Sequence, residues 1–219
     1  MALCLVGSEM CIRDRYNTSK NLTNYANTQK MNDTYLTILN SYGDIVELDY
    51  QFDVPSIIDE LKSIDKWIDG ANNKKGLTLT GNEDDLELTK RNDCSINDNL
   101  KKCPSLLDFF QLWNSLAKCH AVNMNSGSFF RLHRDAYKTA QQMRIFIPLN
   151  KTELHEYAFI YDKNIVELKA GRAYLLNTKK QHGSFAMVDG IYHILMGIYI
   201  NPHNFRVVTE LLPNCTDHQ

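Results

Sequence analysis

The chain lacks the features that mark several protein classes, and each absence excludes one of them. No apolar run approaches the length of a membrane-spanning helix, so we expect no membrane partner. The 24 basic and 26 acidic residues leave a net charge of −2, which provides no broad attraction to nucleic acid. No stripe of basic and aromatic residues indicates nucleic-acid binding either, and no internal repeat is visible.

Cysteine is scarce and irregularly spaced. The chain has 6 cysteines, and no two of them form a C-x-x-C pair. Cys4 and Cys11 lie near the start, and the others are spread over the rest of the chain (Cys94, Cys103, Cys119 and Cys215). This pattern favours unpaired thiols in a reducing compartment, with disulfides as the alternative.

The first residues resemble a sequencing artefact. Residues 5–15, "LVGSEMCIRDR", look like an in-frame translation of a sequencing adapter. The alternative is a short apolar leader, but the apolar run is too short for a signal peptide and no basic segment precedes it. We therefore expect residues 1–15 to lie outside the fold and the protein to be cytoplasmic. Residues 16–40 are polar and predict a tail or linker, and residues 41–210 predict a single domain.

Two amphipathic helices are expected in the first half of the chain. Residues 54–70 begin with a proline in the first turn, carry one apolar stripe and end at Gly70. Residues 104–120 also start at a proline and have helical apolar spacing. Short strands are expected at 44–53, as a sheet edge, and at 76–80, and the polar stretch 81–102 predicts a loop.

After Asn125 the pattern changes to short apolar or alternating runs separated by glycine and asparagine. Such spacing predicts an antiparallel sandwich or barrel, and a tight turn is expected at Ala170-Gly171. With the preceding helices, the fold class is α+β. The seven expected strands are 128–133, 143–149, 157–161, 165–169, 172–177, 181–188 and 192–200.

The stretch "LHRDAYKTAQQMRIF" contains the triplet His133-Arg134-Asp135, which resembles a kinase catalytic loop. That loop needs an asparagine five residues after the aspartate, where this chain has Ala140. No G-x-G-x-x-G precedes the triplet and no D-F-G follows it. The sequence therefore excludes a protein kinase.

A metal site is the better interpretation of the triplet. In a strand, residues two apart point to the same face, so His133 and Asp135 would project together. His182 lies in a later expected strand and could supply a third ligand. Two histidines and one carboxylate with open coordination positions form the facial triad of non-haem iron(II) oxygenases. The triplet alone could arise by chance, so the prediction depends on its surroundings.

The surroundings resemble a known family. The stretches are "GSFFRLHRDAYKTAQQMRIFIPLN" and "LKAGRAYLLNTKKQHGSFAMVDGIYHILMGIYIN". They are similar to the core of 2-oxoglutarate/iron(II) dioxygenases, in the aspartyl/asparaginyl β-hydroxylase-like branch found in phage and metagenomic sequences. The resemblance covers about residues 126–201. It implies a double-stranded β-helix, a jelly-roll or cupin-like core, with supporting N-terminal helices.

The resemblance assigns roles to individual residues. His133, Asp135 and His182 match the iron ligands, and Arg144 matches the arginine of the second motif, although Phe146 replaces its usual histidine. The family also has an arginine about ten residues after the distal histidine, which clamps 2-oxoglutarate. This chain has no arginine there, so Arg144 is expected to be the main anchor, assisted by His193.

The implied function is hydroxylation of an unactivated C–H bond. The cofactor would be iron(II), the co-substrates 2-oxoglutarate and dioxygen, and the substrate a peptidyl residue or a small molecule that the sequence does not identify. Three alternatives remain open from the residues. They are a non-catalytic module that binds a metal or small acid, a zinc hydrolase with the same three ligands, and a purely structural barrel. The hydrolase needs a general base, and no H-E-x-x-H motif is present.

Overall fold

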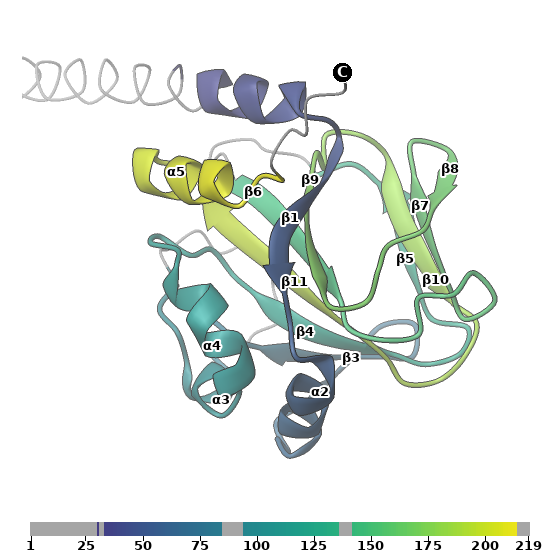
Figure 1. Cartoon of the computed structure of the whole chain (residues 1–219). Helices are drawn as coiled ribbons and strands as arrows, with labels where there is room; N and C mark the ends of the chain where they lie inside the picture. Colours follow the sequence, from purple (N-terminus) through teal and green to yellow (C-terminus); the bar gives the residue numbers. More distant parts are fainter. Residues whose placement is uncertain (1–29, 31–32, 85–93, 136–141, 214–219) are drawn as a thin grey trace, which may run out of the picture.

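The computed structural model describes residues 30, 33–84, 94–135 and 142–213. The predicted adapter segment and most of the predicted tail lie outside them. Two antiparallel sheets face each other, and helices cover the outer face of the larger one (Figure 1). A helix long and apolar enough to cross a membrane does not occur in this described part.

Within the described residues, the large sheet comprises seven strands in the order β1-β9-β6-β11-β4-β3-β2. β11 lies at its centre and pairs with β6 on one side and β4 on the other. The edge strand β1 pairs with β9, as expected for the first predicted strand. The bounds are β1 (Ile45–Gln51), β2 (Ile68–Gly70), β3 (Lys74–Thr78), β4 (His120–Met124), β6 (Gln142–Pro148), β9 (Arg172–Leu176) and β11 (Ile191–Tyr199).

The small sheet, again counted over the described residues, has four strands in the order β5-β10-β7-β8. Its central pairs join β10 to β5 and to β7, all antiparallel. The bounds are β5 (Phe129–His133), β7 (Tyr157–Tyr161), β8 (Asn164–Val166) and β10 (His182–Ala186).

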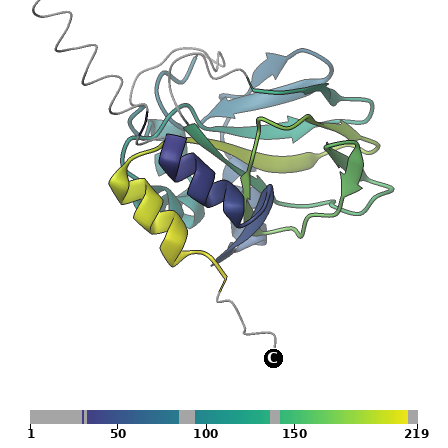
Figure 2. The ribbon, with the colours of Figure 1, turned by 90° about the horizontal axis from the view of Figure 1, so that it is seen from above.

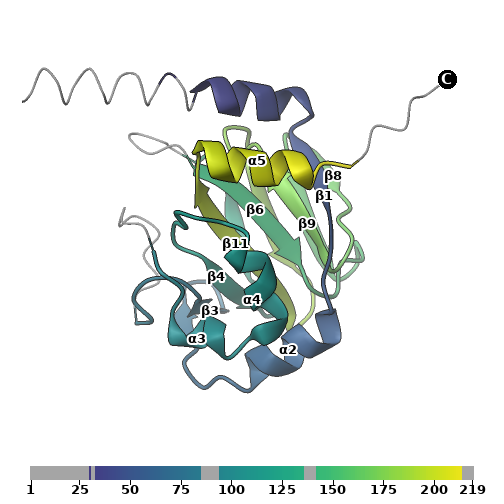
Figure 3. The same ribbon diagram turned by 60° about the vertical axis from the view of Figure 1, so that its left-hand side comes forward.

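The helices lie on the side of the large sheet that faces away from the small sheet (Figure 3). They are α2 (Val54–Lys62), α3 (Asp98–Lys101), α4 (Pro104–Gln111) and α5 (Pro202–Glu210). A further helical segment, 33–41, lies beside α5 (Figure 2), and the rings of Tyr35 and Phe205 stack with centroids 4.5 Å apart. Leu39 of this segment is buried, although the sequence pattern suggested a polar tail up to residue 40.

The large sheet has apolar residues on both of its faces. On the helix side, Phe109 of α4 and Leu61 of α2 belong to a core that includes Ile145, Ile147 and other sheet residues. On the side of the small sheet, a second cluster is rich in aromatic residues: Phe146, Tyr157, Phe159, Tyr161 and Tyr174. Alternate residues of β6 and β11 contribute to the two clusters, as strand geometry requires.

The seven strands expected after Asn125 are all present, although β8 is shorter than predicted. The turn before β9 is confirmed: Gly171 has φ of +73°, and a Cβ there would lie 2.8 Å from Val54 Cγ2. β2, β4, α3 and α5 were not predicted. For α5 a local signal exists, since Asn201 caps the helix by accepting a hydrogen bond from Asn204 N and Pro202 follows it.

The first predicted helix, 54–70, is too long. α2 ends at Lys62, and residues 68–70 form β2, which pairs with β3. Ile64 is buried although it lies beyond the helix. Its apolar character therefore reflects contact with the core and not continued helical geometry.

The second predicted helix, 104–120, is also too long, because α4 ends at Gln111. Ser115 has a φ of 53°, in the left-handed region, which interrupts a right-handed helix. The amide of Ala117 donates to the carbonyl of Gly197 at 2.9 Å, so the chain has joined the large sheet. Sheet pairing overrides the local helical pattern here.

Candidate metal centre

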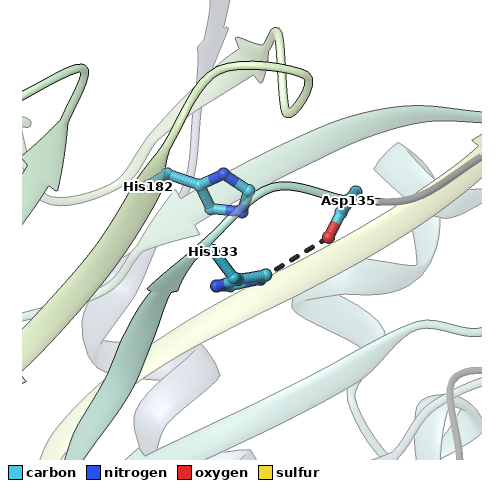
Figure 4. A group of neighbouring side chains, drawn as sticks. All are labelled: His133, Asp135 and His182. Carbon is cyan, nitrogen blue, oxygen red and sulfur yellow. Dashed lines mark ion pairs between the residues drawn. The ribbon is translucent and has the colours of Figure 1, made fainter.

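The three residues predicted to bind a metal come together at one end of the small sheet. His133 is the last residue of β5, and His182 is the first residue of β10. The two are register partners, so their side chains leave the sheet on the same face. Asp135 follows two residues after His133 and turns toward both rings (Figure 4).

The ligand atoms of these residues converge. One potential ligand atom from each lies within 4.8 Å of the others. The two imidazole centroids are 4.3 Å apart, and Nε2 of His133 is 3.5 Å from Oδ1 of Asp135. Two ring nitrogens and a carboxylate oxygen at such separations can bind one divalent ion from adjacent directions.

Hydrogen bonds to the backbone orient both rings. Nδ1 of His133 lies 2.6 Å from the carbonyl of Arg131, and Nδ1 of His182 lies 3.0 Å from that of Lys180. Because a carbonyl only accepts, each Nδ1 carries a proton, and Nε2 of each ring is left to face the cavity. Metal-binding histidines are typically held in this way. For His133, Nε2 faces a carboxylate oxygen of Asp135, and the hydrogen bond between them raises the pKa of the imidazole. A bound divalent ion would take the place of the proton between these two atoms.

Asp135 is held as an anion. Burial favours its neutral form, but the hydrogen bond with His133 and the charge of Arg144 outweigh burial and lower its pKa well below the usual range. Arg144 Nε lies 3.3 Å from Asp135 Oδ2, and the amide of Asp135 donates to the carbonyl of Thr178 at 3.0 Å. The carboxylate is thus positioned and ionised, as a metal ligand must be.

The three residues line a cavity of about 130 Å³ between the two sheets. Its volume corresponds to roughly four water molecules at ~30 Å³ each, enough for a small organic acid. Much of the wall is apolar and includes Phe130, Phe146, Phe159 and Leu195. The polar side chains among the described lining are His133, Asp135, His182, Arg144, Lys118, Thr178, Tyr157, Ser184 and His193.

Arg144 and His193, the residues predicted to bind the co-substrate, line different parts of this cavity. Arg144 contacts Asp135, so it stands beside the three metal-binding residues. Its guanidinium lies over Gly197, where a Cβ would come within 2.3 Å of Arg144 Nη1. His193 is the register partner of Pro148, four residues further along β6 from Arg144. Arg144 and His193, which were expected to bind the co-substrate together, are therefore separated along the cavity.

His193 is almost completely enclosed, with 1% of its surface exposed. Its ring centroid lies 5.0 Å from that of Phe146, 5.9 Å from that of Phe130 and 6.1 Å from that of Tyr157. Nδ1 of His193 has no hydrogen-bond partner among the described residues. Burial and the charge of Lys74 lower its pKa to about 3, so the ring is neutral near pH 7.

The sequence patterns did not identify Lys74, which lies in β3 beside Phe130 and whose charge acts on His193. A signal was available: Lys74 and Lys75 are adjacent in a strand, so one of them must face inward. Lys75 is exposed and forms an ion pair with Asp69 at 3.7 Å. Lys74 is half-buried, and its ammonium lies 4.3 Å from the ring centroid of Phe130.

No family model and no curated protein sequence matches this chain. Solved structures do resemble it. An oxidoreductase of the 2OG-Fe(II) oxygenase family from Burkholderia pseudomallei has a TM-score of 0.53 at 13% identity, covering 77% of this chain and 89% of that one. HygX from Streptomyces hygroscopicus, with nickel, 2-oxoglutarate and hygromycin B bound, has a TM-score of 0.51 at 13% identity, covering 76% and 86%.

A prolyl-4-hydroxylase from Pseudomonas putida has a TM-score of 0.50 at 8% identity, with 74% of this chain and 95% of that one covered. At such low identity the likeness concerns the fold. It confirms the predicted α+β class with a jelly-roll, double-stranded β-helix core.

Proposed function

We propose that the protein is an iron(II)- and 2-oxoglutarate-dependent oxygenase that hydroxylates an unactivated C–H bond. The observation that carries this proposal is the convergence of His133, Asp135 and His182 at a cavity, with both Nδ1 atoms bonded to backbone carbonyls. The fold is shared with oxygenases of this type, which adds support. A peptidyl residue or a small molecule is the proposed substrate, and the aspartyl/asparaginyl hydroxylase-like branch remains part of the proposal.

The residues present fit an iron(II) ion. Two imidazole nitrogens and one carboxylate would hold the ion, and its remaining coordination positions would be available to a 2-oxo acid and to dioxygen. Bound iron(II), with these co-substrates, supplies oxidation of a C–H bond coupled to decarboxylation of the 2-oxo acid. The chain's contribution is to hold the three ligands, bind the acid and exclude water through the aromatic wall.

Arg144 has two roles in this proposal. Its contact with Asp135 orients the carboxylate and keeps it ionised. Its charge also lies beside the metal-binding residues, where it can pair with a carboxylate of the incoming acid. Gly197 permits this placement, since any larger residue would collide with the guanidinium.

The zinc hydrolase alternative fits less well. Such an enzyme needs a general base near the metal-bound water. Among the described residues that line the cavity, Asp135 is the only carboxylate, and it is already engaged as a ligand. A module that binds a metal or an acid without turnover would use the same cavity. It would differ from the proposed oxygenase only in that it does not oxidise a substrate.

The proposal is tested by adding iron(II) to protein purified without oxygen and titrating 2-oxoglutarate. We expect a visible metal-to-ligand charge-transfer band, absent in His182→Ala and weakened in Arg144→Ala. Lys75→Met, an exposed change on β3, serves as the control and should behave as wild type. Wild-type protein that binds iron(II) but gives no band would favour the binding module. Protein that binds no iron(II) would refute the metal site.

A further inference from the structure

The turn before β10, residues 177–181, holds two of the three metal-binding residues. The carbonyl of Thr178 accepts a hydrogen bond from the amide of Asp135 at 3.0 Å, and the side chain of Thr178 is hydrogen-bonded to the carboxylate of Asp135. The carbonyl of Lys180 accepts a hydrogen bond from Nδ1 of His182 at 3.0 Å. A displacement of this turn would therefore redirect two metal ligands at once.

The carboxylate of Asp44, the residue immediately before β1, anchors the turn at two points. Its Oδ1 accepts a hydrogen bond from Nδ2 of Asn177 at 2.9 Å, and its Oδ2 forms an ion pair with the ammonium of Lys180. The hydrogen bond from Lys180 lowers the pKa of Asp44, so the carboxylate is ionised near neutral pH. One side chain therefore contacts both the first residue of the turn and the residue whose carbonyl holds His182.

Backbone pairing brings Asp44 to this position. β1 and β9 lie side by side, with Ile45 opposite Leu176 (Figure 1). The pairing continues for one more residue, because the amide of Asn177 donates to the carbonyl of Asp44 at 2.8 Å. The hydroxyl of Tyr161 donates to the carbonyl of Asn177 at 2.7 Å. The carboxylate and the turn are thus held against each other by the backbone as well as by side chains.

The side-chain contacts of Asp44 should contribute little to the stability of the fold. The side chain of Asp44 is 35% exposed and that of Lys180 is 41% exposed, and solvent weakens ion pairs of this kind. Metal affinity is more sensitive, because groups that orient metal ligands typically change it by about 10- to 100-fold. Loss of the Asp44 carboxylate should therefore affect metal binding more than folding.

We propose that Asp44 is a positioning residue for the metal centre. Through its contacts with Asn177 and Lys180, Asp44 fixes the turn. The turn in its place orients Asp135 and His182, the two ligands that are bonded to its carbonyls. The inference rests on the proposed function, because it takes these two residues to be metal ligands.

The test measures nickel(II) dissociation constants by calorimetry and cobalt(II) absorption spectra, which report the geometry of the ligands, on the full chain. Asp44→Ala should weaken nickel(II) binding by about tenfold and change the cobalt(II) spectrum. The midpoint of urea denaturation without metal should change little. Asp44→Asn keeps an oxygen that can accept from Asn177, so it should recover part of the affinity.

Two further variants provide a control and a second measurement. Asp49→Ala makes the same change on the same strand, at a side chain that is 71% exposed and pairs with Arg172, and it should match wild type. Asn177→Ala removes the donor to Asp44 and should also weaken nickel(II) binding, which keeps the test valid if Asp44→Ala is unstable. The double variant Asp44→Ala, Asn177→Ala should bind about as tightly as Asp44→Ala, because the two residues act through one contact.

The possible failures of this test are distinguishable. Wild-type affinity and an unchanged cobalt(II) spectrum in Asp44→Ala and Asn177→Ala would overturn the inference and leave the metal centre in place. An equal loss of affinity in Asp49→Ala, or strictly additive losses in the double variant, would overturn it as well. If wild type itself binds no nickel(II), the metal centre and the proposed function fail, and the role of Asp44 fails with them.

Discussion

The two faces of the large sheet differ in how completely they are filled by side chains. The face toward the helices is filled with aliphatic and aromatic side chains, and Ile57, Leu61 and Phe109 there are fully buried. The face toward the small sheet surrounds a cavity and includes a buried histidine whose Nδ1 has no partner among the described residues. Packing on the helix side stabilises the fold. On the cavity side, polar and apolar groups lack neighbours that a bound ligand can supply.

The largest expected difference between the faces concerns stability. Phe109→Ala removes a fully buried ring on the helix side and should lower the free energy of unfolding by about 3–5 kcal/mol. Phe159→Ala, beside the existing cavity, should cost less because the ring has neighbours on fewer sides. Urea denaturation measures both. Equal losses would show that the cavity face is as tightly filled as the other.

Metal binding should stabilise the cavity face specifically. Nickel(II) at 100 times its dissociation constant should raise the free energy of unfolding by about 2.7 kcal/mol, and a chelator should reverse the rise. His182→Ala should abolish it, whereas Phe109→Ala should retain it at a lower starting stability. An undiminished rise in His182→Ala would place the metal elsewhere.

The buried imidazole predicts a pH dependence. The pKa of His193 is about 3 in the folded protein, below its ordinary value of 6.5, so the unfolded chain binds the proton first. The contribution of His193 to the free energy of unfolding has its full value above about pH 6.5. It decreases as the pH falls toward 3, by up to about 1.4 kcal/mol for each pH unit. His193→Leu should remove this part of the slope between pH 7 and 5. Parallel slopes in denaturation curves of the two proteins would contradict the assignment.

The smallest expected effect lies on the helix side. Asp53 caps α2, accepting hydrogen bonds from the amide and hydroxyl of Ser56. Asp53→Ala should cost about 1 kcal/mol of stability without changing nickel(II) affinity. Asp53→Asn, which keeps a capping oxygen, should be nearly neutral. A change in metal affinity with Asp53→Ala would mean that the two faces are coupled.

Local sequence patterns were informative wherever the fold depends on neighbouring residues. Apolar runs between turn residues located the strands after Asn125, and the two-residue spacing of His133 and Asp135 indicated a shared direction. The same reasoning extended both helices too far, because Ile64 and Leu116 are apolar for reasons of tertiary contact. Leu116 forms a bridge to Ile198 of β11, a partner distant in the chain.

The sequence by itself determined the strand-rich second half and the shared direction of His133 and Asp135, because periodicity and spacing act within a few residues. Only the tertiary structure decided that Arg144 stands beside Asp135 and that Lys74 of β3 approaches His193 of β11. Both outcomes depend on strand order and register across a sheet. Long-range backbone pairing sets these relationships, and no short stretch of sequence encodes them.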